Sequence, residues 1–97
     1  MNLGHAIKLC RTQRNLSLVE LAERVGITPS YLSLLERNKR DPVFSVVANL
    51  AYVLNVPMLI LLFLAADEDD LCGLSDDIQS KLAYAAFETI KKDNGKE

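Results

Sequence analysis

The chain has 97 residues, 49% of them hydrophobic and 25% charged, a composition that fits one globular domain and excludes wholesale disorder. The chain has one histidine, His5, only two cysteines and no glycine-rich phosphate loop. These residues are too few to build a catalytic triad, a zinc site or a nucleotide site. We therefore expect no catalytic residue, no metal and no cofactor. The net charge of −2 is unevenly spread, because residues 1–40 carry seven basic and three acidic groups (+4), whereas residues 67–97 carry four basic and nine acidic groups (−5).

The first helix is predicted over residues 3–14. Leu3, Ile7 and Cys10 recur there at the spacing of one helical face. Asn15, a residue that tolerates the left-handed conformation, is expected to end this helix.

A complete helix start signal stands at Ser17. Ser17 is the expected N-cap, and Glu20, three residues later, closes a capping box with it. The helix predicted from this start covers residues 18–25 and ends at Gly26, where a left-handed residue is expected.

A third helix is predicted over residues 29–37. Thr28 is its expected N-cap, and Pro29 occupies the first helical position, where a missing N–H costs nothing. Asn38 takes the place of the usual capping glycine. The residues expected to face mostly outward are Ser30, Ser33, Leu34 and Arg37.

Residues 43–66 are long and apolar enough to suggest a membrane span. Asn49 and Asn55 within the segment, and Pro57 in its second half, argue against a span. We therefore predict two helices, 44–54 and 57–64, joined by a turn at residues 55–57. We predict no strand, since the best strand candidate in the chain, residues 42–47, is weak.

The sequence divides into residues 1–66 and an extension, residues 67–97. The extension begins with a solvated acidic linker at residues 67–70 and continues with a helix capped by Ser75. The helix at 57–64 is apolar on every side and must be covered all round, and the last helix carries an apolar stripe. We expect these two helices to pack together, within one chain or between subunits, and residues 93–97 to fray. Whether they build a dimer or only complete the core of one chain is left open.

Two short helices joined by a three-residue turn led by glycine form the helix-turn-helix pattern, here at residues 18–25 and 29–37. Such a unit needs a small residue where its helices approach most closely, and Ala22 is suited to that place. It also needs apolar residues where the helices cross, here Leu21, Val25, Ile27, Leu32 and Leu35.

Residues 3–64 resemble the phage-repressor/Cro family, also called the xenobiotic-response-element family of helix-turn-helix regulators. The run SLVELAERVGITPSYLSLLERNKRDP, residues 17–42, resembles the family's signature closely. The resemblance implies an all-α fold, a five-helix lambda-repressor-like DNA-binding domain, here with an additional C-terminal helix. It further implies a dimer on an inverted-repeat operator, with the second helix of the motif in the major groove. Arg11 and Glu36 resemble the family's internal ion pair, a structural feature.

By the same resemblance, the base-reading positions are Pro29, Ser30, Ser33 and Leu34. The serine hydroxyls can donate to or accept from several bases, whereas Pro29 and Leu34 could touch thymine methyl groups. Family members often carry a glutamine where Leu18 stands. We favour simple packing at the helix start as the role of Leu18.

Phosphate contacts are expected from main-chain N–H groups at the starts of the two motif helices, with Ser17 and Thr28 beside them. The side-chain candidates are Arg14, Arg37, Lys39 and Arg40. A solvated charged surface is the alternative, but their clustering around the motif favours phosphate for Lys39 and Arg40.

The leading interpretation is a homodimeric, sequence-specific DNA-binding transcriptional regulator, by family default a repressor, that acts in the cytoplasm. Its expected partners are double-stranded DNA and a second copy, bound through the helix at 57–64 and the C-terminal helix, with no membrane and no known small-molecule ligand. The alternative is a helical protein-interaction module with the same fold that no longer reads DNA. The acidic segment 67–77 could also compete with DNA for the basic face, although a solvated linker is the favoured interpretation.

Overall fold

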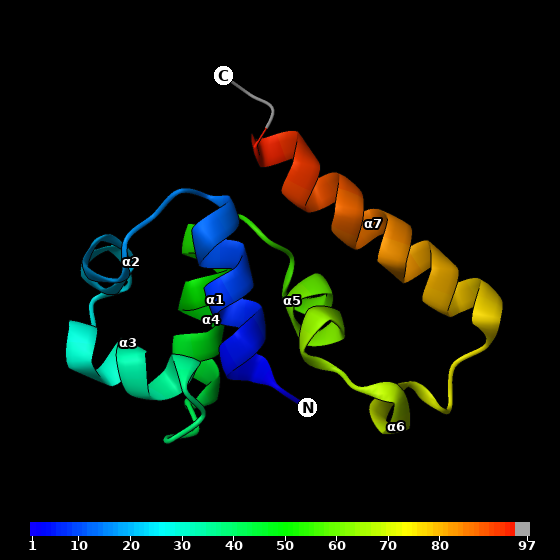
Figure 1. Ribbon diagram of the computed structural model, residues 1–97, viewed down its shortest axis with the longest axis horizontal. Coiled ribbons are helices and arrows are strands. Elements are labelled where there is room, and N and C mark those ends of the chain that lie inside the picture. Colours follow the sequence, from blue (N-terminus) through cyan, green and yellow to red (C-terminus); the bar gives the residue numbers. More distant parts are fainter. Residues whose placement is uncertain (95–97) are drawn as a thin grey trace.

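The computed structural model describes residues 1–94, with side chains as far as Lys91, and this part of the chain is helical without any strand. In Figure 1, α1 stands near the middle with α4 behind it, α2 and α3 lie on one side, and α5, α6 and α7 lie on the other. The helices are α1 (Leu3–Gln13), α2 (Leu18–Val25), α3 (Pro29–Glu36), α4 (Phe44–Leu54), α5 (Met58–Ala65), α6 (Glu68–Leu71) and α7 (Asp76–Asn94). The predicted all-α fold is confirmed.

Short polar signals set the helix boundaries where the sequence predicts them. The Ser17 Oγ accepts the Glu20 N–H at 3.0 Å, and the Glu20 carboxylate accepts the Ser17 N–H at 2.8 Å, which completes the capping box. The backbone is left-handed at Gly26 (φ 88°) and also at Asn15 and Asn38, both with φ of 58°. Each of these residues ends a helix and turns the chain toward the next one.

The core forms where α1 and α4 meet the other helices. Ile7 and Cys10 of α1 are fully buried, as are Leu50 and Leu54 of α4. The helix predicted over residues 44–54 is confirmed, because α4 begins at Phe44 and turns Val47 into this core, and the weak strand candidate at residues 42–47 forms no strand. Helical periodicity therefore overrides the local β-branched composition there.

The apolar segment 43–66 folds as two helices, α4 and α5, bent by 105° at the turn between them. Asn55 in this turn is left-handed, with φ of 57°. Among the described residues no single helix is long and apolar enough to cross a membrane, and only this bent pair reaches that length and composition together.

The acidic segment after α5 is exposed, but it is folded as the short helix α6. Asp67 is the N-cap of α6, and its carboxylate accepts the Asp70 N–H at 2.9 Å. The amino group of Met1 lies 3.2 Å from the Asp67 carboxylate and 3.0 Å from that of Asp70. These contacts tie α6 to the start of α1.

The last helix, α7, packs against α5 and α1 of its own chain. Its N-terminus is capped as predicted, since the Ser75 Oγ accepts the Ile78 N–H at 3.2 Å. Ala86 is its buried residue, and Leu82 and Ala85 are half-buried beside it. The helix continues to Asn94, so fraying does not begin at residue 93, and the expectation for residues 95–97 lies outside the described residues.

Candidate nucleic-acid interface

Helices α2 and α3 form one packed unit that presents the outer face of α3. The turn between them consists of Gly26, Ile27 and Thr28, and it reverses the chain at the left-handed glycine. Ala22 is fully buried, as the small residue expected at the closest approach of the two helices must be. Thr28 starts α3 by accepting the Tyr31 N–H on its hydroxyl at 3.0 Å.

The four predicted base-reading residues come together on one surface. Pro29 and Ser30 are exposed, and Ser33 and Leu34 are half-buried. All four line one shallow surface depression, which we call the α3 depression, together with Leu18 and Arg37. This surface therefore combines two hydroxyl groups with apolar carbon groups and one guanidinium at its edge.

The basic residues at the end of α3 are exposed, as phosphate-binding residues must be. Arg37 is the C-cap of α3, and the left-handed Asn38 turns the chain so that Lys39 and Arg40 follow in the loop. The Arg40 guanidinium lies over the Tyr31 ring, 5.7 Å from its centroid.

Ser17 and Thr28 are the N-caps of α2 and α3. The first main-chain N–H groups of a helix have no partner inside the helix and carry partial positive charge. The hydroxyl of each capping residue accepts one such N–H and can still donate its own hydrogen. Both caps are exposed, so the two helix starts can offer donors to an anion.

Arg14 is held away from this surface by hydrogen bonds within the chain. Its Nε donates to the Leu54 carbonyl oxygen at 2.8 Å, and its Nη1 donates to the Ile90 carbonyl oxygen at 3.3 Å. Further bonds reach the carbonyl oxygens of Asn55 and Thr89, at 3.3 and 3.5 Å. The guanidinium thus stabilises the C-terminal end of α4, where a cation is favoured, and joins it to main-chain oxygens of α7.

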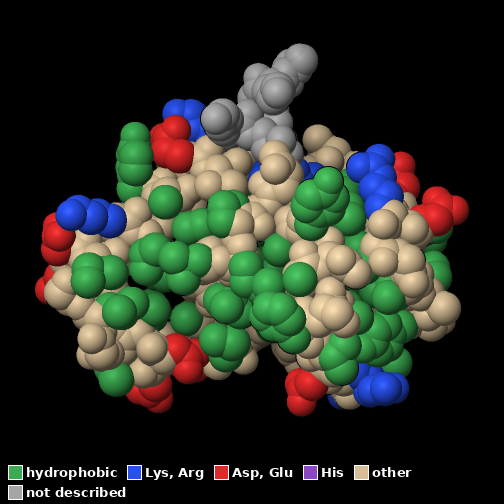
Figure 2. Space-filling view, turned by 180° about the vertical axis from the view of Figure 1, so that it is seen from behind, with side chains coloured by type: hydrophobic (Ala, Val, Ile, Leu, Met, Phe, Trp, Pro, Cys, Tyr) green, Lys and Arg blue, Asp and Glu red, His purple; other side chains and the backbone are tan. Residues whose placement is uncertain are grey.

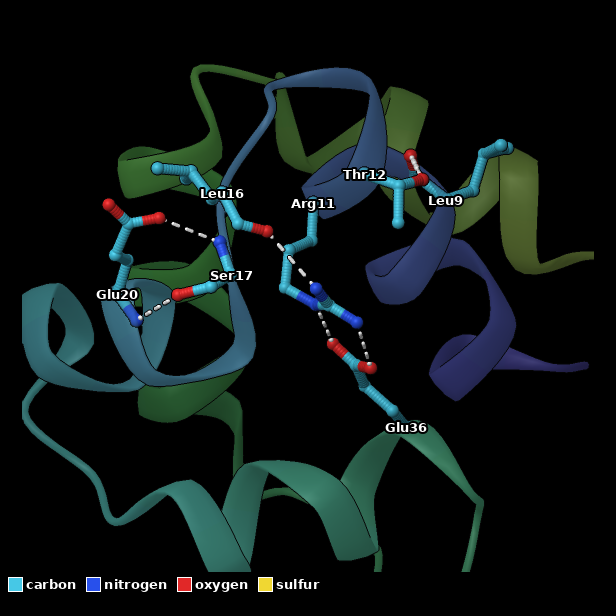
Figure 3. Close-up of polar contacts among 7 residues, drawn as sticks. All are labelled: Leu9, Arg11, Thr12, Leu16, Ser17, Glu20 and Glu36. Carbon is cyan, nitrogen blue, oxygen red and sulfur yellow. Dashed lines mark hydrogen bonds and ion pairs between the residues drawn. The ribbon is translucent and has the colours of Figure 1, made fainter.

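A bidentate ion pair fixes the end of α3 against α1. The Arg11 Nε and Nη2 donate to the two Glu36 carboxylate oxygens at 2.7 and 3.0 Å, and Nη1 donates to the Leu16 carbonyl oxygen at 3.0 Å (Figure 3). The two side chains are only 13% and 6% exposed. The hydrogen bonds to Glu36 raise the pKa of Arg11. The pair therefore positions α3, as the expected structural role requires.

The sequence interpretation missed a second contact between α1 and the end of α3. The Gly4 N–H donates to the Asn38 side-chain oxygen at 3.1 Å, and the Asn38 amide donates to the Asn2 side-chain oxygen at 2.6 Å. A Cβ atom on Gly4 would lie 2.6 Å from the Glu36 carbonyl oxygen. The only available signal was a glycine inside a helical pattern, which often marks a close approach.

The remaining chemically reactive residues lie elsewhere. His5 and Cys72 are exposed, and Cys10 is buried, so that burial raises the pKa of its thiol. Across the described part of the chain, no group of three or more His, Cys, Asp or Glu side chains is arranged to hold a metal ion.

Comparisons with known proteins agree with this geometry. The family model described as helix-turn-helix matches residues 7–61. The HTH-type transcriptional regulator SinR of Bacillus subtilis is 39% identical over 61 residues, which are 62% of this chain and 55% of SinR. The immunity repressor protein of Bacillus phage phi105 is 36% identical over 56 residues, 58% of this chain and 39% of the repressor. The chain therefore spans about half of these relatives or less.

A solved structure shares the fold as well. The crystal structure described as the master regulator for biofilm formation SinR in complex with DNA is 39% identical, with a TM-score of 0.59, over 62% of this chain and 97% of that one. These relatives are named as regulators and a repressor rather than as enzymes. The chain belongs to the phage-repressor/Cro-like helix-turn-helix family.

Proposed function

We propose that the chain is a DNA-binding transcriptional regulator that places α3 in the major groove. One observation carries this proposal: the four base-reading residues implied by the family resemblance line the α3 depression together. The hydroxyl groups of Ser30 and Ser33 can bond to base edges there, as side chains of a recognition helix do. The related SinR has been solved in complex with DNA, which supports DNA binding by this chain.

In this proposal, phosphate groups are bound on both sides of the α3 depression. The starts of α2 and α3, with Ser17 and Thr28, offer main-chain and hydroxyl donors. Arg37, Lys39 and Arg40 offer exposed cations at the other end of α3. Arg14 is not part of the set, because its guanidinium is bonded to main-chain carbonyl oxygens of Leu54 in α4 and Ile90 in α7.

The regulator would act as a homodimer through α5 and α7. Leu59 of α5 and Tyr84 and Phe87 of α7 are 64%, 67% and 60% exposed. Exposure of large apolar side chains to water is unfavourable, and a second copy of the chain would cover them. Seen from behind, hydrophobic side chains gather across much of the molecule's surface, including the side where α7 lies (Figure 2). A dimer would present two α3 helices to half-sites about 34 Å apart, and it would repress by occluding the operator.

Selection from random duplex DNA at near-physiological salt tests this function. We expect an inverted repeat with half-sites about ten base pairs apart to be enriched. A matched selection with a Ser30→Ala, Ser33→Ala variant should change the enriched sequence, because the two hydroxyls would no longer reach base edges. No enrichment by a folded, dimeric protein would contradict the proposal.

A protein-interaction module with the same fold is the second candidate. The apolar character that Leu18, Pro29 and Leu34 give the α3 depression, and the net charge of −2, favour it over an ordinary DNA reader. The salt dependence of DNA affinity separates the two, since each phosphate contact contributes about −0.9 to the log–log slope. A flat slope would favour the interaction module.

A further inference from the structure

The α3 depression has an apolar side that phosphate binding does not use. Leu18, the first residue of α2, and Leu34 of α3 are both half-buried in it, although their helices are separate. Pro29 adds more carbon surface at the start of α3. Two helices thus bring apolar side chains to the surface that faces the bases in the proposed complex.

Core packing explains only one of the two leucines. Leu18 packs against the hydrophobic core, in agreement with the packing role expected from the sequence, and it lines the α3 depression as well. Leu34 does not pack against that core, and yet it is only partly exposed. Its side chain is therefore available to a ligand that enters the depression, and replacing it leaves the core filled.

The chemistry of base edges decides what this apolar surface can accept. Nitrogen and oxygen atoms of a base edge would lose water against leucine without gaining a hydrogen bond, which is unfavourable. The apolar group that a base presents in the major groove is the methyl on C5 of thymine, and 5-methylcytosine carries the same group. Ser30 and Ser33 stand beside the leucines and can donate to O4 of thymine or accept from N4 of cytosine.

We propose that the α3 depression encloses the C5-methyl group of a pyrimidine in each half-site, between Leu34 and Leu18. This specificity rests on the proposed function, since it requires α3 to lie in the major groove. It assigns Leu18 a reading role in addition to packing. The hydroxyls of Ser30 and Ser33 then orient the same base through its polar edge.

Replacing single thymines by uracil tests the proposal, because it removes only the methyl group. The dissociation constant of the selected duplex would be measured with each thymine of the half-site replaced in turn. Burial of one methyl predicts a loss of affinity of about 4-fold at one position, and about 15-fold when both half-sites are changed. Duplexes with cytosine or 5-methylcytosine at that position then identify which methylated pyrimidine is bound more tightly.

Variants of the leucines link the methyl effect to the depression. Leu34→Ala should bind thymine and uracil duplexes almost equally, because the methyl would no longer be enclosed. Leu18→Ala should also reduce the ratio of affinity for the thymine duplex to affinity for the uracil duplex. Circular dichroism would confirm that this variant folds. Val19→Ala is the matched control, because Val19 is the next residue of α2, is 56% exposed and does not line the depression. Its ratio of thymine to uracil affinity should stay unchanged.

The results separate this inference from the proposed function. If no duplex is selected, the proposed function itself fails. If a duplex is selected but uracil binds as well as thymine at every position, DNA reading stands and the methyl inference is overturned. A methyl effect that persists in Leu34→Ala and in a folded Leu18→Ala also overturns it, because the methyl would then act through the shape of the DNA.

Discussion

At the residue scale, a few side chains determine how α3 is held against the rest of the molecule. Arg11 and Glu36 join α1 to the end of α3, and Gly4 lets the two elements approach at the same end. Because α3 carries the proposed base-reading residues, a shift of this junction would move the α3 depression relative to α1. Both contacts can be tested separately from DNA binding.

Glu36→Gln should destabilise the chain by about 3 kcal/mol, because it leaves a mostly buried guanidinium without its counter-charge. Urea denaturation measures this loss. Lys81→Met is the matched control, since Lys81 and Asp77 pair on α7 with side chains 76% and 74% exposed. Its cost should be about 0.5 kcal/mol or less. Equal costs for the two variants would contradict the structural role of the Arg11–Glu36 pair.

Gly4→Ala should destabilise the chain by about 1–3 kcal/mol, although alanine favours helices, because the added Cβ meets main-chain oxygens that cannot move freely. Thermal denaturation measures the effect. Gly73→Ala provides the control, since a Cβ there would meet nothing within 4 Å. A neutral Gly4→Ala would contradict the close approach of Gly4 to the main chain at the end of α3.

Residues whose role is local were the ones that sequence could predict. Gly26, Asn15 and Asn38 adopt the left-handed conformation expected of them, because a helix end depends on its own few residues. The hydrogen-bond partners of Arg14 and Gly4 were not predicted, since these partners lie 34 to 76 positions away in the chain. Such contacts depend on how whole helices pack, which periodicity alone does not specify.

At the element scale, a complete capping box defines the start of α2. Hydrogen bonds from the Ser17 main-chain N–H and hydroxyl lower the pKa of Glu20. The helices were predictable here and in α4, and Leu21 and Ala22 of α2 are buried as their predicted places require. The folding of the acidic segment as α6 was not predicted. This helix has only four residues, and its start depends on the two hydrogen bonds of a capping box between Asp67 and Asp70.

The Glu20 carboxylate should make stability depend on pH. Since its pKa is lower in the folded chain, its contribution is fully present above the unfolded pKa and is lost as pH falls through the folded value. Glu20→Gln should therefore be less stable than the wild type at pH 7, with the difference disappearing toward pH 3. Urea denaturation at both pH values measures it. A difference that does not change with pH would contradict this role of the capping box.

At the scale of the whole molecule, α7 covers part of α5 but leaves large apolar side chains outside. If α5 and α7 form the proposed dimer, Leu59→Glu and Phe87→Glu should each shift the protein toward monomer, because a charge would be buried in the interface. Sedimentation equilibrium measures this shift. Tyr52→Glu on α4, at an 86% exposed position outside the proposed interface, should leave the dimer intact. A wild-type protein that sediments as a monomer would contradict the proposed dimer.

Whether DNA lies against α3 and the basic residues that follow it can be decided by the salt dependence of binding to the selected duplex. We expect a steep log–log slope of affinity against salt concentration. Lys39→Gln and Arg40→Gln should each make this slope shallower by about 0.9 for the contacts of a single subunit, or by twice that in a dimer. Lys8→Gln, an exposed cation of α1 outside the proposed set, should leave the slope unchanged. A slope near zero, or one that none of the α3-side variants alters, would contradict the account.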